Sequence, residues 1–322
     1  MKAIIKSAVF GLLGSQPFAA RRARSLGGTG RVTILNLHRV APADGSAYPP
    51  LDPQIFRELL RFCSANYEIC GLRDLPKRAG GDKPVMVLSF DDGYKDFIEY
   101  AVPIMSEFGL TANQNVIPKC IESGEPPFNV VMQDFIGRAP ESLLADMSIP
   151  GFDMSTAGTD RMVMGHRISH FIKTRPMAEQ ALLSAALRLQ FERDDDFRST
   201  PLMTRAEVIS LASDHEIGAH SFEHATMGFE SDAYVAEDAR LCRDYFDRVL
   251  GLPTDIYAFP NGSHSQRQID LVAEQGFSIP LLLEEDFSGH NTSIHRRFSF
   301  HAGTVGEARF KASGGFRNRY PV

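Results

Sequence analysis

The sequence of 322 residues has no tryptophan, only four cysteines and no long apolar run. The cysteines are too widely spaced for a CxxC pair, so they indicate neither a disulfide framework nor a structural zinc site. We expect small buried thiols, although Cys63 and Cys70 could pair in an oxidising compartment. Because no stretch approaches the ~20 apolar residues that span a bilayer, we do not expect an integral membrane protein.

An excess of positive charge is also absent. The formal net charge is −6 at pH 7, which gives no general attraction for nucleic acid or for polyanionic glycans. We therefore expect no nucleic-acid partner, and any recognition of an anion has to be local. The length suits one large α/β domain with insertions, or two modest domains.

The N-terminal segment, residues 1–30, has two interpretations. Early lysines, a short apolar stretch and small residues ending at Ala20 resemble a signal peptide, which would mean export. However, Gly11, Gly14 and Pro17 interrupt the apolar stretch, and arginines follow at once. We favour a basic amphipathic segment that lies on an anionic membrane or packs on the domain of a cytoplasmic protein.

The rest of the chain alternates between strand and helix patterns. Such alternation predicts a parallel sheet, either open and doubly wound or closed as a barrel. The pattern loosens between residues 119 and 199, which we interpret as an irregular, partly helical insertion within a domain formed by residues 31–118 and 200–305, with residues 306–322 as a tail. The expected strands are residues 31–40, 85–90, 110–118, 215–220, 255–260, 277–283 and 296–300.

The stretch LSFDDGY, residues 88–94, places Asp91 and Asp92 directly after a buried apolar strand. By itself an Asp-Gly pair is a common turn signal. Downstream, IGAHSFEH places His220 and His224 at the end of another predicted strand. Two histidines and one carboxylate form a metal site with open coordination positions, and parallel strands would bring all four residues to one rim.

A second pair of histidines has the same spacing. His166 and His170 lie on a probable helix inside the insertion, with no carboxylate placed beside them by the strand pattern. An HxxxH pair without a third ligand is a weak signal, so we expect a solvated helix face there.

Three motifs together resemble the polysaccharide deacetylase family, the NodB-homology carbohydrate esterases. They are FDDG at residues 90–93, HSFEH at 220–224 and AFPNG at 258–262. The LHRV segment before the first helix and an arginine of the last strand, Arg297 or Arg296, extend the match. The resemblance covers about residues 31–118 and 200–300.

This resemblance implies a distorted (β/α) barrel and a divalent metal, with zinc preferred and iron, cobalt or nickel left open. It implies N-acetylated glycans as substrates. The residues it implies are Asp92, His220 and His224 as metal ligands, Asp91 as general base, Arg297 as partner of the base, His295 as general acid with His301 and His38 as alternatives, and Pro260, Asn261, Gly262 and His38 as substrate contacts.

The sequence also departs from the family pattern. Ala258 and Phe259 stand where an arginine often precedes the proline of the third motif, so we expect Arg297 to supply that role. Without tryptophan, the tryptophan-containing motif that shapes the acetyl pocket is absent or replaced by apolar residues.

The leading interpretation is a metal-dependent hydrolase that removes N-acetyl groups from aminosugars of a polysaccharide or a lipid-linked glycan, as in exopolysaccharide synthesis. Deformylation, hydrolysis of a small amide, and an inactive carbohydrate-binding homologue remain alternatives. An interaction protein in which both motifs are structural is a further one.

Overall fold

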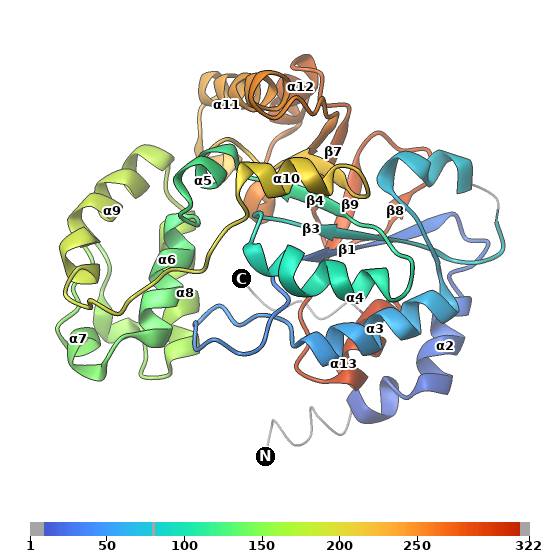
Figure 1. Ribbon diagram of the computed structural model, residues 1–322, viewed down its shortest axis with the longest axis horizontal. Helices are drawn as coiled ribbons and strands as arrows, with labels where there is room; N and C mark the ends of the chain where they lie inside the picture. Colours follow the sequence, from blue (N-terminus) through green and yellow to red (C-terminus); the bar gives the residue numbers. More distant parts are fainter. Residues whose placement is uncertain (1–9, 79–80, 316–322) are drawn as a thin grey trace.

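The computed structural model describes residues 10–78 and 81–315. Seven parallel strands form a closed barrel at its centre, because β1 pairs with β3 on one side and with β9 on the other (Figure 1). The expected distorted (β/α) barrel is therefore confirmed. In order around the barrel its strands are β1 (Arg31–Leu37), β3 (Val85–Phe90), β4 (Asn113–Val116), β5 (Glu216–Ala219), β6 (Ile256–Ala258), β7 (Ile279–Leu283) and β9 (His295–Ser299).

Alternate residues of each strand face the barrel interior, which changes in polarity along its length. On β1, Val32 and Ile34 belong to an apolar cluster with Val87 of β3, near the amino ends of the strands. Two residues further along, Asn36 and Ser89 are buried polar residues that both bond to one guanidinium. The interior is thus apolar at one end and polar at the carboxyl end, where the active sites of such barrels lie.

Helices cover the outside of the barrel and bury the other face of the strands. The first begins after Asp52, whose carboxylate accepts hydrogen bonds from the backbone N–H groups of Gln54 and Ile55, with Pro53 as its first residue. The covering helices are α3 (Pro53–Asn66), α4 (Val102–Ser106), α10 (Arg205–Leu211), α11 (Asp232–Asp244), α12 (Gln266–Glu274) and α13 (Val305–Ala312).

The insertion, which we expected to be irregular and partly helical, lies to one side of the barrel and is mostly helical (Figure 1). It has its own hydrophobic core, in which Phe135, Ile168 and Leu187 are almost fully buried. Its helices are α5 (Pro118–Ser123), α6 (Phe128–Arg138), α7 (Glu141–Ala145), α8 (Arg161–Lys173) and α9 (Met177–Phe191).

Both ends of the described chain pack on the barrel domain. Helix α2 (Gln16–Arg24) buries Ala19 and Ala23 in the main core, and the Tyr67 hydroxyl of α3 donates to the carbonyl of Ala312 at 2.6 Å. Residues 305–312 therefore form a packed helix, α13, where we expected a tail. Two short strands pair with strands of the barrel: β2 (Glu68–Ile69) is parallel to β3, and β8 (Ser288–Gly289) is antiparallel to β1.

The four cysteines are free and buried, as expected. Among the described residues, no helix has both the length and the apolar character needed to cross a bilayer.

Candidate metal centre

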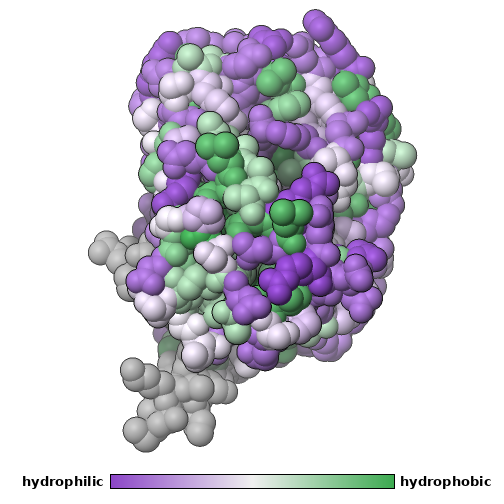
Figure 2. All heavy atoms as spheres, turned by 90° about the vertical axis from the view of Figure 1, so that its left-hand side faces the viewer, coloured by the Kyte–Doolittle hydropathy of each residue, from purple (hydrophilic) through white to green (hydrophobic). Residues whose placement is uncertain are grey.

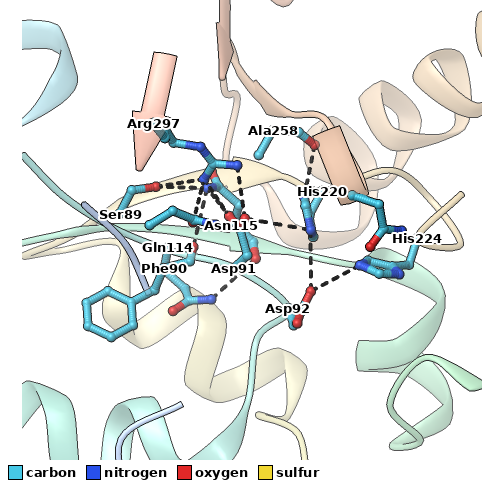
Figure 3. Close-up of polar contacts among 12 residues, drawn as sticks. Ser89, Phe90, Asp91, Asp92, Gln114, Asn115, His220, His224, Ala258 and Arg297 are labelled. Carbon is cyan, nitrogen blue, oxygen red and sulfur yellow. Dashed lines mark hydrogen bonds and ion pairs between the residues drawn. The ribbon is translucent and has the colours of Figure 1, made fainter. Parts of the chain in front are cut away.

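Asp92, His220 and His224 meet in a buried cluster at the carboxyl ends of β3 and β5 (Figure 3). Oδ1 of Asp92 lies 3.3 Å from Nε2 of His220 and 3.4 Å from Nε2 of His224. Within residues 10–78 and 81–315 this is the one group of three or more potential ligands whose donor atoms converge. The parallel strands β3 and β5 thus bring the three predicted metal ligands together.

The atoms in this cluster fit a cation. Nδ1 of His220 lies 2.9 Å from the carbonyl oxygen of Ala258, which can only accept a hydrogen bond, so the proton lies on Nδ1 and Nε2 presents its lone pair to Asp92. Burial lowers the pKa of His224 to about 3, which keeps its imidazole neutral. Oδ1 of Asp92 is buried without a hydrogen bond. A divalent cation would satisfy all three groups.

Asp91 is held beside the cluster by a dense set of hydrogen bonds. The Arg297 guanidinium donates to Oδ1 at 2.8 Å and to Oδ2 at 2.9 Å, while Asn115 donates to Oδ1 at 2.8 Å. Burial alone would raise the pKa of the Asp91 carboxyl, but Arg297 and His220 hold it well below its usual range. Oδ2 lies 3.8 Å from Nε2 of His220. Asp91 is therefore an ionised carboxylate at the edge of the metal centre.

The backbone that carries the ligands is unusual. Asp92 has φ of 76° and His224 has φ of 65°, values that aspartate tolerates better than most residues and that favour glycine. This conformation turns both Asp91 and Asp92 toward one centre, although neighbouring side chains of a strand face opposite ways.

Asp238, on α11, holds in place the loop that carries both histidines (residues 220–224, the histidine loop). The sequence interpretation missed this residue. Its buried carboxylate accepts hydrogen bonds from the Ser221 hydroxyl, the Phe222 N–H and the Tyr257 hydroxyl, each at 2.8 Å. The signal was present, because Asp238 lies among Val235, Ala239 and Cys242 on the buried face of an amphipathic helix. A charge at such a position indicates a network.

The structure does not bring His295, which we expected to be the general acid, to the candidate metal ligands. His295 is the first residue of β9, two residues before Arg297, so it faces the amino end of the barrel, where its Nδ1 contacts the Ser288 hydroxyl at 2.8 Å. His38, which directly follows β1 at the carboxyl end, interacts electrostatically with both Asp92 and Asp91. The structure therefore brings His38, rather than His295, to the metal centre.

The AFPNG residues lie at the same rim. Pro260, Asn261 and Gly262 follow β6, whose last residue, Ala258, contacts His220. The Asn261 amide donates to the Thr226 hydroxyl at 2.8 Å. These residues lie beside the histidine loop, and their contacts with substrate stay a prediction.

His166 and His170 are exposed on α8 and join no ligand cluster among the described residues. They match the expected solvated helix face.

Comparisons with known proteins agree with this geometry. The family model for polysaccharide deacetylase matches residues 198–280, which include both histidines of the cluster. No curated protein matches the chain in sequence.

Solved structures of deacetylases share its fold. The Streptococcus pyogenes deacetylase PplD, determined in complex with acetate, has a TM-score of 0.56 at 15% identity, covering 87% of this chain and 97% of its own. IcaB from Ammonifex degensii has a TM-score of 0.54 at 14% identity, covering 88% and 97%. A de-N-acetylase from Aggregatibacter actinomycetemcomitans has a TM-score of 0.52 at 14% identity, covering 87% and 99%. At these identities the likeness shows the fold alone.

Fold and site together define a NodB-type barrel with a candidate metal centre at the carboxyl ends of its strands. The resemblance to the polysaccharide deacetylase family, first seen in three short motifs, is confirmed.

Proposed function

We propose that the protein is a metal-dependent hydrolase that removes N-acetyl groups from aminosugars of a glycan. The observation that carries this proposal is the buried Asp92, His220 and His224 cluster with the ionised Asp91 beside it. Two imidazole nitrogens and one carboxylate suit zinc and leave coordination positions open for reactants. A divalent cation bound there supplies Lewis acidity to the acyl carbonyl and to the attacking water.

Asp91 is the group that takes the proton from water in this proposal. Oδ1 already accepts two hydrogen bonds, whereas Oδ2 accepts one and lies on the side of His220. Arg297 and Asn115 keep the carboxylate charged and fix its plane, so proton transfer needs no reorientation.

We assign the proton donor for the leaving amine to His38. Burial lowers the pKa of His38 despite the nearby Asp92 and Asp91. Its imidazole is therefore mostly neutral before the reaction, and we infer that the proton that Asp91 takes from water is passed on to His38, which then donates it to the leaving amine.

The proposal is tested with zinc-loaded protein and N-acetylated chitooligosaccharides, measuring released acetate and bound metal. We expect His220→Ala and His224→Ala to lose the metal, and Asp91→Asn to keep it while turnover falls about 10²-fold or more. Full activity of Asp91→Asn, or acetate release without any divalent ion, would show the proposal to be wrong. Release of formate in place of acetate from a formylated sugar would identify a deformylase.

We also propose that the N-terminal segment contacts an anionic membrane, as a lipid-linked glycan substrate would require. Leu12 and Phe18 are 73% and 43% exposed, and Arg21 and Arg24 of α2 are exposed as well. Apolar side chains beside arginines suit the boundary of an anionic bilayer.

The membrane contact is tested by flotation with vesicles that contain phosphatidylserine. The Leu12→Ser/Phe18→Ser variant should lose vesicle binding. A matched control is Leu182→Ser/Leu189→Ser, which alters two leucines of α9, each 73% exposed. Helix α9 lies on the left-hand side of Figure 1, the side that faces the viewer in Figure 2. Equal flotation of both variants and the parent protein would rule out this contact.

A further inference from the structure

The chain between β1 and α3 forms a compact loop, residues 41–50, which we call the Tyr48 loop. Val40 and Leu51 pair at its base, where the N–H of Leu51 donates to the carbonyl of Arg39 at 3.0 Å and the N–H of Ala41 donates to the carbonyl of Leu51 at 3.1 Å. Its two ends thus lie side by side, as in an Ω-loop, a class of loop that often carries function. In Figure 1 the loop, in blue, extends from β1 toward the helices of the insertion.

His38 lies between β1 and the Tyr48 loop, beside the proposed base. The register of the parallel strands pairs Leu37 with Phe90, and the N–H of Asp91 donates to the carbonyl of Leu37 at 3.0 Å. Leu37 and Phe90 are buried in the main core under the covering helices. Because successive side chains of a strand alternate, the residues that follow them, His38 and Asp91, face the interior of the barrel. The strand register therefore places His38 next to Asp91 at the rim.

Tyr48 packs on His38 from the loop. The two ring centroids lie 6.1 Å apart with the planes at 76°, an edge-to-face contact, and the ring of Tyr94 lies 6.4 Å from that of Tyr48. The backbone of Tyr48 is held at both groups, because its N–H donates to the Ser46 hydroxyl at 2.9 Å and its carbonyl accepts from the Arg39 guanidinium at 3.2 Å. The ring that borders His38 thus depends on the conformation of the loop.

A row of alternating charges holds the Tyr48 loop between the barrel and the insertion. Nε of Arg39 donates to Asp96 at 2.9 Å, and its Nη2 donates to Asp44 of the loop at 2.8 Å. Arg138 of α6 donates to the same oxygen of Asp44 at 2.6 Å and lies 3.3 Å from Asp134. The side chains of Arg39 and Asp96 are only 5% and 7% exposed, so this end of the row is screened little by solvent. These five residues form a charge ladder from the barrel to the insertion.

We propose that Arg39 is a positioning residue for the hydrolysis. With Asp44 and Arg138 it fixes the Tyr48 loop, so that Tyr48 keeps the His38 imidazole where it receives the proton that Asp91 takes from water. This inference rests on the proposed function, because it takes His38 as the proton donor, and it gives the insertion a part in the chemistry of the barrel.

An alternative is that the charge ladder only fastens the insertion to the barrel. The two roles differ in what they change. A ladder that only fastens affects thermal stability alone, whereas a positioning ladder also affects the surroundings of the His38 imidazole and the rate of proton transfer.

The surroundings of His38 are measured by NMR on zinc-loaded, full-length protein with isotope-labelled histidine. The His38 signal is identified by its absence in His38→Gln, and Tyr48→Leu shows where the signal lies without the neighbouring ring. Arg39→Lys and Arg138→Met should both move the signal toward its position in Tyr48→Leu. Arg39→Lys keeps a cation beside the buried Asp96, so the barrel still folds, but one ammonium cannot replace the three bonds of the guanidinium.

Turnover is measured on the same samples as acetate released from N-acetylated chitopentaose. In Arg39→Lys and Arg138→Met we expect kcat to fall about tenfold and KM to stay within about twofold, because a displaced proton donor costs turnover rather than binding. Arg138→Lys keeps a cation beside Asp44 and should restore most of the turnover.

The matched control is Arg161→Met. Arg161 is 30% exposed, against 23% for Arg138, and it donates to three carbonyls of residues 136–139, all within the insertion. Its loss should lower the melting temperature but leave the His38 signal and kcat unchanged.

An unchanged His38 signal in both Arg39→Lys and Arg138→Met would overturn the proposal, and so would a signal that moves without a loss of kcat. If the signal moves as expected but no N-acetylated glycan releases acetate from the parent protein, the proposed function fails while the contact between the ladder and His38 stands.

Discussion

Each residue of the metal centre depends on a neighbour that sets its orientation or its charge. His220 is oriented by the Ala258 carbonyl, Asp91 is held ionised by Arg297, and the histidine loop is fixed by Asp238. Such partners matter because a ligand that rotates freely pays an entropy cost when metal binds. A substitution of Arg297 should therefore mainly change turnover, and a substitution of Asp238 should mainly change metal affinity.

His38 and His295 give the sharpest contrast between residues. His38→Gln should lower kcat by about 10²-fold to 10⁴-fold, the usual contribution of a general acid, and leave bound zinc unchanged. His295→Gln should change kcat only a few-fold, because His295 lies at the opposite end of the barrel. Steady-state kinetics and metal analysis of both variants decide the matter. Loss of turnover in His295→Gln with normal kinetics in His38→Gln would restore the original assignment.

Substitution of Asp238 tests whether this residue holds the histidine loop in place for metal binding. Asp238→Ala leaves the Ser221 and Tyr257 hydroxyls without their acceptor, so zinc affinity should fall about 10-fold to 100-fold, as for other residues that hold metal ligands. Zinc affinity is measured by competition with a chelator. The control is Glu237→Ala, which removes an exposed carboxylate from the adjacent position of α11 and should leave zinc affinity unchanged. A lower melting temperature with normal zinc affinity would mean that Asp238 is only structural.

At the scale of elements, helices α6 and α8 of the insertion contact the loop after β1, at residues 45–47. They approach it closely because Gly137 and Gly165 have no side chains. Gly165→Ala places a methyl group 2.5 Å from Cβ of Ala47, and both atoms are fixed to backbone. We expect a loss of about 1–3 kcal/mol from overpacking, which outweighs the gain of about 1 kcal/mol in helix propensity. Chemical denaturation measures the change.

The helical Gly11 provides the matched control, because a Cβ atom there would meet nothing within 4 Å. Gly11→Ala should be neutral or slightly stabilising. Equal stability of the Gly165→Ala variant and the parent would contradict the tight contact.

The elements that could be predicted from sequence are those whose signal is local. Buried parallel strands such as Val85–Phe90 are continuous apolar runs, and the polar residues that follow them mark the carboxyl rim. This placed Asp91, Asp92, His220 and His224 together correctly. The same rule excludes His295, because it precedes the expected last strand, residues 296–300, and β9 pairs in parallel with β7 and β1.

At the scale of the whole molecule, the two ends of the described part of the chain pack against each other on the barrel domain. Helix α13 packs against α3 and α2, with Ala308 and Ala312 buried in the main core. Truncation after residue 304 removes α13 and exposes the apolar face of α3, so the melting temperature should fall by several degrees or soluble protein should be lost. Truncation after Gly315 keeps every contact described here and serves as the control. Equal melting temperatures of the two truncations would show that α13 adds nothing to stability.

The insertion begins and ends at one place on the barrel. Ile117, just before it, and Leu202, just after it, belong to the same small buried cluster, and Met203 donates from its N–H to the carbonyl of Gly93 at 2.9 Å. The chain can thus leave and rejoin the barrel without disturbing the strand order. For protein engineering, this makes residues 118–201 a segment that can be exchanged without altering the order of the barrel strands.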